Sequence, residues 1–195
     1  MEYEELFEQN HSNIGGFCRH YMFLYSLILG MEAKTVFEFG SGFSSKAILM
    51  ALKKTGGKLI SCDNRKLEET GSFYKKDDLM KSLSDRWEYL QCDSLKIDKH
   101  LDKEVFEVVL HDGSHDYKHV LKDLEYIVPK IKLGGILLLH DTNHPTQDFN
   151  LLQSIKDLPY ELSCVTLPYG YGLTIAEITE DFGNGKVEIQ WRKCR

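Results

Sequence analysis

Acidic side chains follow successive strand-like runs of this sequence, each at or beside the point where the run ends. They are Glu38, Asp63, Asp93, Asp112 and Asp141. Ligands of open parallel sheets bind beyond the carboxyl ends of the strands, so these groups should face one site. Carboxylates accept hydrogen bonds from ribose hydroxyls, from an amino group or from an ammonium, and they also bind divalent cations. A ligand with a ribose, a base and a cationic part would suit this row.

A glycine-containing turn follows the first of these runs. Residues 38–45 read EFGSGFSS, so Gly40 and Gly42 separate a strand from a helix at a point where backbone must approach a ligand closely. This pattern alone is weak evidence, because ordinary strand-to-helix turns also use glycine. A dinucleotide-binding turn would have glycine in place of Ser45, and Glu38 would repel a pyrophosphate. The turn therefore disfavours NAD.

Two strand-like runs both end in His-Asp. Residues 111–117 read HDGSHDY, and residues 134–141 read GGILLLHD. A neutral imidazole can take up a proton near pH 7, and a carboxylate can bind a divalent cation. The histidines of this segment also have i, i+4 spacing, which equally fits a structural role, and we expect His119 to be a solvated helix residue.

Periodicity predicts the elements that must position these groups. The expected strands span residues 35–39, 58–62, 87–92, 106–111, 136–140, 161–167 and 173–178, and helices are expected within 17–29, 44–54, 65–83 and 117–128. The last two strands are joined by PYGYG with no room for a helix, so they should pair antiparallel. The prediction is a Rossmann-like, doubly wound α/β fold: a mostly parallel seven-stranded sheet with a C-terminal antiparallel hairpin.

Length and composition limit the class of protein. The chain has 195 residues, a net charge of −6 and five cysteines, which are scattered singly and are interpreted as free thiols. One domain is expected, with a helical segment at 1–30, a cofactor-binding core at 31–180 and a tail at 181–195. The acidic balance argues against a nucleic-acid partner. No secretory signal or membrane-spanning run is visible, so we expect a cytoplasmic protein.

The turn at residues 38–42 resembles the first motif of the class I S-adenosylmethionine (SAM)-dependent methyltransferases, an acidic residue followed by any residue and GxG. In that family the loop wraps the methionine part of the cofactor, and an acidic residue ending the second strand holds the ribose. The resemblance implies adenine contacts at Asp93 and Ser94, and it places Ser44 where the family usually has glycine. The cofactor-binding residues that it implies are Glu38, Gly40, Ser41, Gly42, Ser44, Asp63, Asn64, Asp93, Ser94 and Asp112.

The two His-Asp segments resemble a narrower branch, the compact methyltransferases related to sugar and macrolide O-methyltransferases and to cephalosporin hydroxylase-like proteins. Metal-dependent members bind magnesium through an Asp after the fourth strand and an acidic pair after the fifth. The resemblance implies Asp112, His140 and Asp141 as metal ligands, with His115 as the catalytic base beside Asp112. Since His140 replaces an acid, the site either is weakened, prefers Mn²⁺ to Mg²⁺, or is absent. Asn143 offers a substitute oxygen ligand.

The resemblance implies a SAM-dependent methyltransferase, assisted or not by a divalent metal, that acts on a hydroxyl group of a small molecule such as a sugar or secondary metabolite. Two alternatives stay open: a metal-dependent hydrolase or oxygenase built on the His/Asp cluster, and a non-catalytic cofactor-binding partner domain. The hydrolase alternative assigns no role to Glu38, the glycine turn or Asp63. Residues 1–30 offer little cover for an acceptor, so a homodimer that completes the site is a further hypothesis.

Overall fold

A computed structural model of the chain describes residues 16–70 and 81–180. The predicted helical segment before residue 16, the part of the predicted helix at 71–80 and the tail at 181–195 lie outside the described residues. Within the described part, no helix combines the length and the apolar character needed to cross a bilayer.

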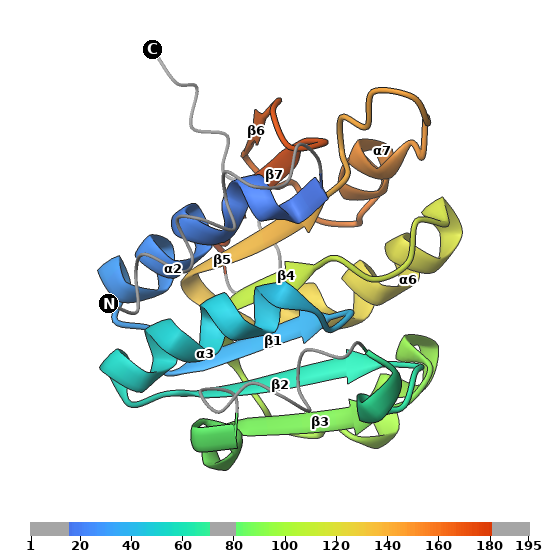
Figure 1. Ribbon diagram of the computed structural model, residues 1–195. Coiled ribbons are helices and arrows are strands. Elements are labelled where there is room, and N and C mark those ends of the chain that lie inside the picture. Colours follow the sequence, from blue (N-terminus) through green and yellow to red (C-terminus); the bar gives the residue numbers. More distant parts are fainter. Residues whose placement is uncertain (1–15, 71–80, 181–195) are drawn as a thin grey trace.

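The described residues form a seven-stranded sheet (Figure 1). Its strands are β1 (Thr35–Phe39), β2 (Lys58–Asp63), β3 (Trp87–Gln91), β4 (Phe106–His111), β5 (Ile131–His140), β6 (Cys164–Leu167) and β7 (Leu173–Glu177). They lie in the order β3-β2-β1-β4-β5-β7-β6. Strands β1 to β5 run parallel, and β7 runs antiparallel to both β5 and β6. The predicted Rossmann-like sheet with an antiparallel C-terminal hairpin is confirmed.

Helices cover both faces of the sheet. The α-helices are α2 (Tyr21–Gly30), α3 (Phe43–Thr55), α6 (Tyr117–Ile127) and α7 (Leu151–Lys156), and the 3₁₀ helices are η1 (Gly16–His20), η2 (Leu67–Glu69), η3 (Ser84–Arg86), η4 (Ser94–Lys99) and η5 (Val128–Lys130). Helices α2 and α3 share one apolar core with Val36, whereas α6 and α7 share the other with Phe37 and Phe39. Successive side chains of a strand point to opposite faces, so β1 serves both cores, with Glu38 on the same side as Val36.

Several element bounds differ from the prediction. Strand β5 begins at Ile131, five residues before its predicted start at residue 136. The register of its pairing with β4 shifts between Phe106 and Val108, and Gly134, which lies in the opposing part of β5, adopts φ +76°. The helix expected from residue 17 is divided into η1 and α2, and β6 begins at Cys164 rather than at residue 161. The six-residue helix α7 was not predicted, because it is too short to show a helical period.

The glycine turn touches the end of β4. Gly40 adopts φ +81°, and a Cβ atom there would lie 2.3 Å from the carbonyl oxygen of Asp112. Only glycine lets the two segments approach so closely. The backbone N–H of Gly40 donates to the carbonyl of Cys62, and that of Asp112 donates to the carbonyl of Phe39. These hydrogen bonds hold the carboxyl ends of β1, β2 and β4 next to one another.

Candidate active site

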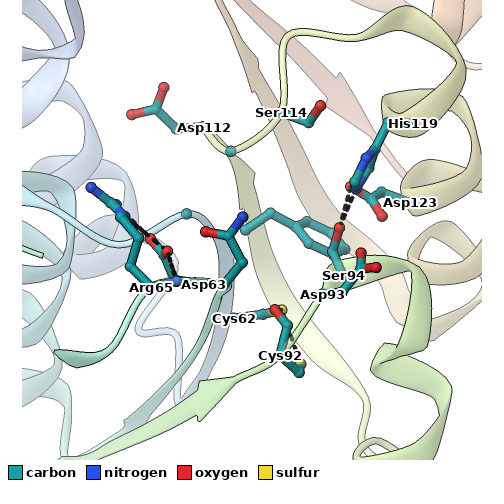
Figure 2. Close-up of a pocket in the computed structure, with 14 residues that line it drawn as sticks. Cys62, Asp63, Arg65, Cys92, Asp93, Ser94, Asp112, Ser114, His119 and Asp123 are labelled. Atoms are coloured by element: carbon teal, nitrogen blue, oxygen red, sulfur yellow. Dashed lines mark hydrogen bonds and ion pairs between the residues drawn. The ribbon is translucent and has the colours of Figure 1, made fainter. Parts of the chain in front are cut away.

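A cavity of about 480 Å³ opens at the carboxyl ends of β1 to β4 (Figure 2). The predicted cofactor residues that line it are Gly40, Asp63, Asn64, Asp93, Ser94 and Asp112. The remaining predicted ones, Glu38, Ser41, Gly42 and Ser44, belong to the glycine turn or its support and are absent from the lining. Residues that were not predicted to bind a cofactor also line it, namely Phe39, Cys62, Arg65, Cys92, Gly113, Ser114, His119 and Asp123.

Both carboxylate oxygens of Asp63 accept hydrogen bonds at this cavity. Arg65 donates from its backbone N–H and from Nε, each at 2.9 Å, and from Nη2 at 2.5 Å (Figure 2). The backbone N–H of Ser41 donates at 3.0 Å. Burial alone would raise the pKa of Asp63, but the hydrogen bonds and charge of Arg65, together with Ser41, lower it below its usual value. A ribose would have to share these oxygens with Arg65.

Glu38 lies beneath the turn with 0% of its surface exposed. Its carboxylate accepts hydrogen bonds from the hydroxyl groups of Ser44 at 3.1 Å, Ser61 at 2.5 Å and Ser45. Burial raises the pKa of Glu38 to about 7, although the three hydroxyls act in the opposite direction. The carboxylate holds the turn and the first residues of α3 from below.

A second group of side chains meets at the ends of β4 and β5. His115 Nε2 lies 2.6 Å from Asp141 Oδ2. His140 Nδ1 lies 3.0 Å from Asp112 Oδ1 and 3.1 Å from Asp141 Oδ2, and its Nε2 lies 2.9 Å from the carbonyl oxygen of Gly170. Asp141 adopts φ +57°, which is uncommon for a residue with a side chain. The four predicted metal and catalytic residues are thus brought together.

The hydrogen-bond partners fix where protons lie in this cluster. A carbonyl oxygen only accepts, so Nε2 of His140 carries a proton. Burial alone would lower the pKa of His140, but Asp112 and Asp141 raise it to about 10. The hydrogen bond to Asp141 raises the pKa of His115 against the effect of partial burial. For Asp141, the two imidazoles overcome burial and hold the pKa well below its usual range.

The cluster also fits a divalent cation. One ligand atom each from Asp112, His140 and Asp141 lies within 4.8 Å of the others. With Nε2–H donated to Gly170, a neutral His140 would offer the lone pair of Nδ1. Metal-binding histidines commonly donate their other ring N–H to a backbone carbonyl in this way. One nitrogen and two carboxylates suit Mn²⁺ better than Mg²⁺. Asn143 uses its side-chain amide to donate to the carbonyl oxygen of Pro168 at 3.0 Å.

A second cavity, of about 490 Å³, is lined by residues 141–152. Asp141 forms part of its wall together with Phe149 and His144. The ring of Phe149 stacks on His115 with 4.6 Å between centroids, and His144 contacts Tyr171 at 4.3 Å. We call Asp112, His115, His140 and Asp141 the His/Asp cluster. Asp112 lines the first cavity and Asp141 lines the second, so this cluster contributes one residue to each cavity.

His119 is only in part the solvated helix residue that was predicted, because its side chain is 28% exposed. His119 Nε2 lies 2.6 Å from Ser94 Oγ and the residue lines the first cavity (Figure 2). Behind them, Asp123 Oδ2 lies 3.0 Å from both Ser94 Oγ and His111 Nε2. The i, i+4 spacing of His119 and Asp123 was the one sequence signal for this group. Asp116 caps the first turn of α6, accepting from the backbone N–H of His119.

The N-terminal segment packs beside the cluster. The Phe17 ring lies 4.9 Å from that of His140, and His20 stacks on Tyr169 at 5.1 Å. His20 Nε2 also lies 3.2 Å from the carbonyl oxygen of Gly170. Although little cover was expected from residues 1–30, η1 therefore holds the turn between β6 and β7 against the site.

Comparison with known proteins places these features in a family. A family model described as "Methyltransferase domain" matches residues 37–142, which is more than half of the chain. No curated protein matches the sequence.

Solved structures share the fold at low sequence identity. An SAH-bound methyltransferase from Podospora anserina is 14% identical, with a TM-score of 0.68, 92% of this chain covered and 88% of that one. The Bacillus cereus O-methyltransferase in complex with SAH is 16% identical, with a TM-score of 0.62 and coverages of 91% and 88%. TomG, an O-methyltransferase from Streptomyces achromogenes in complex with SAM, is 14% identical, with a TM-score of 0.64 and coverages of 92% and 90%. With the glycine turn, the row of carboxylates and the C-terminal hairpin all inside this architecture, the chain belongs to the methyltransferase domain family.

Proposed function

We propose that the protein is a SAM-dependent O-methyltransferase that acts on a small hydroxylated molecule. The observation that carries this proposal is the His/Asp cluster, which has Asp112 on the first cavity and Asp141 on the second. A methyl donor in the first cavity and a hydroxyl acceptor in the second would meet beside His115. Holding two reactants in one geometry removes a large part of the entropic barrier to transfer.

The lining of the first cavity supports SAM as the donor. Asp63 offers carboxylate oxygens to ribose hydroxyls, and Asp93 with Ser94 offers acceptors to the adenine amino group. Gly40 lets the methionine part approach the backbone, and Asp112 suits its ammonium. When bound, SAM supplies a methyl group that its sulfonium has already made electrophilic.

The remaining task of the protein is to take the proton of the acceptor hydroxyl. Because the Asp141 carboxylate accepts the proton on Nε2 of His115, the lone pair of the neutral imidazole lies on Nδ1. We assign Nδ1 as the atom that removes the hydroxyl proton. Stacking on Phe149 holds the ring in plane while this happens. A positioned base of this kind contributes roughly 10²–10⁴-fold to the rate.

A divalent cation would be held by Asp112, His140 and Asp141. Bound there, it would lower the pKa of an acceptor hydroxyl and orient vicinal oxygens. The mixed nitrogen and oxygen donors support Mn²⁺ as the preferred ion.

Calorimetric titration of the metal-stripped protein with SAM, SAH and NAD, repeated with Mn²⁺ and Mg²⁺, tests the proposal. Saturable binding of SAM and SAH without binding of NAD is the expected result. Methyl transfer from labelled SAM to a panel of sugars and phenols would then identify the acceptor. If neither SAM nor SAH binds while Mn²⁺ does, the protein is instead a candidate metal-dependent hydrolase or oxygenase.

A further inference from the structure

Two cysteine side chains meet in the lining of the first cavity. Cys62 lies in β2, Cys92 directly follows β3, and their Sγ atoms are 3.4 Å apart (Figure 2). Both residues line the cavity. Along the chain 30 positions separate this pair, which is why the cysteines were interpreted as scattered free thiols. Their proximity comes from the pairing of β2 with β3.

The geometry of the pair suits a covalent link. Cys62 aligns with Leu90 in the sheet, so Cys92 lies two residues farther along the same face of the neighbouring strand. A disulfide has sulfur atoms about 2.05 Å apart, so the two sulfurs need to approach by only about 1.4 Å. Residues offset by two positions on neighbouring strands have Cα atoms about 7–8 Å apart, at the upper end of what a disulfide spans, so closing the link combines rotation of the side chains with a small shift of the backbone after β3.

We propose that Cys62 and Cys92 form a dithiol modification site, which a two-electron oxidant such as hydrogen peroxide converts to a disulfide. We further infer that this disulfide weakens cofactor binding and that bound cofactor slows its formation. The proposal of a modification site depends only on the positions of the two thiols. The coupling to the cofactor rests on the proposed function of the cavity.

Cys92 is the first thiol to react. Burial raises the pKa of the Cys62 thiol, and the neighbouring Cys92 thiol adds to the effect, whereas Cys92 is only partly buried. After its proton passes to water, the Cys92 sulfur attacks peroxide, an S–O bond forms and the O–O bond breaks. The departing hydroxide takes up that proton as water.

The second step closes the disulfide. The Cys62 sulfur attacks the sulfur of the Cys92 sulfenic acid, the S–S bond forms and the S–O bond breaks. The leaving hydroxide takes the Cys62 proton and departs as a second water. Two thiols are oxidised by two electrons, and one peroxide is reduced to two waters.

The link would act where the cofactor is expected to bind. Asp63 directly follows Cys62, and Asp93 directly follows Cys92. A disulfide would therefore tie together the strand ends that carry the proposed ribose and adenine contacts. We expect the oxidised protein to bind SAH at least about fivefold more weakly, which corresponds to about 1 kcal/mol.

The test treats the full chain with hydrogen peroxide, blocks remaining thiols with iodoacetamide and maps disulfides by peptide mass spectrometry. The expected product is an intramolecular Cys62–Cys92 link that dithiothreitol reverses. Cys164→Ala is the matched control, because Cys164 is exposed and distant in sequence from the pair, and it should form the same link. Cys62→Ala and Cys92→Ala should not. Absence of the link from the wild-type protein, with peroxide consumed only at other cysteines, overturns the site without bearing on the methyltransferase proposal.

Titration of reduced and oxidised protein with SAH tests the coupling. If the link forms and reduced protein fails to bind SAH, the modification site stands and the proposed cofactor cavity is wrong. If reduced protein binds SAH but the oxidised protein binds equally well and saturating SAH leaves the oxidation rate unchanged, the coupling is overturned.

Discussion

His115 and Asp141 are joined by a 2.6 Å hydrogen bond between Nε2 and Oδ2, although 26 positions separate them in the sequence. Asp141 directly follows β5, and His115 lies in the loop after the neighbouring β4. The carboxylate determines which imidazole nitrogen carries a proton and which one is available to a substrate.

Replacing His115 with alanine should separate chemistry from binding. We expect turnover to fall roughly 10²–10⁴-fold because the hydroxyl proton loses its acceptor. SAH affinity should change by less than about twofold, which is under 0.5 kcal/mol. Single-turnover methyl transfer and calorimetry measure the two effects. His100→Ala, at an exposed histidine, is the matched control and should leave both unchanged. A His115→Ala enzyme of normal turnover would remove the residue from the mechanism.

Asp141→Asn tests the orienting role of the carboxylate. Asparagine tolerates the φ of +57° at this position, so the fold should be retained. The amide removes the charge that stabilises protonated His115, and kcat should fall at least about tenfold, a loss of about 1.4 kcal/mol in the transition state. Steady-state kinetics with a saturating cofactor should show the loss in kcat rather than in the KM for SAM. Unchanged kcat would mean that His115 acts without this partner.

Replacing Asp63 with alanine should weaken cofactor binding, whereas replacing Arg65 with alanine should not. Asp63→Ala removes charged hydrogen bonds worth roughly 1.5–3 kcal/mol each and should weaken SAH binding at least about tenfold. Arg65→Ala removes the side-chain donors that occupy the same oxygens, so SAH should bind at least as tightly as to the wild type. Calorimetry compares the three proteins. A loss with Arg65→Ala as large as that with Asp63→Ala would make Arg65 a ligand-binding residue instead of a competitor.

Glu38 should make folding stability depend on pH. Its pKa is raised from 4.5 to about 7, so its ionisation opposes folding, with Asp112 adding repulsion to the burial penalty. The stabilising protonated form is fully present below pH 4.5 and is lost as pH rises through about 7. Between pH 5 and pH 8 this costs about 2 kcal/mol of unfolding free energy.

Glu38→Gln keeps a neutral side chain at all pH values and should flatten this dependence in urea unfolding. The serine hydroxyls can still donate to the amide oxygen, so the variant should fold. Glu88→Gln, at an exposed position, should keep the wild-type pH profile. Identical profiles for Glu38→Gln and the wild type would show that the buried carboxyl does not titrate in this range.

His140→Asp tests whether the donor set decides metal preference. The variant turns one nitrogen and two carboxylates into an all-oxygen set, which magnesium prefers. We expect Mg²⁺ to bind at least about tenfold more tightly than to the wild type, a gain of about 1.4 kcal/mol by calorimetry. Circular dichroism checks that the fold is kept. Equal and measurable Mg²⁺ affinities would show that residue 140 does not decide the metal preference, and no binding of either Mg²⁺ or Mn²⁺ to both proteins would mean that these carboxylates do not form a cation site.

Local patterns were enough to place the strands and the row of acids. The strands at Thr35–Phe39 and Phe106–His111 have the predicted bounds. A short, mostly apolar run is typical of a strand that is buried on both faces, and the turn residues after it mark where the strand ends. Contacts between strands were not predictable in the same way. The meeting of Cys62 with Cys92 depends on the register of β2 and β3, which the composition of one strand does not encode. The contact of Ser94 with His119 depends in the same way on how η4 and α6 pack, which neither segment shows by itself.

The carbonyl oxygen of Gly170 lies within hydrogen-bond distance of two imidazoles, His20 from η1 at 3.2 Å and His140 from β5 at 2.9 Å. A carbonyl has two lone pairs, so one atom serves both. The N-terminal segment and the hairpin therefore share one hydrogen-bond acceptor, and a chimera with another methyltransferase should exchange them together. A graft that takes the hairpin without its matching N-terminal segment would remove the His20 contact to Gly170 and the Phe17 ring that packs on His140, even though every residue of the central sheet is retained.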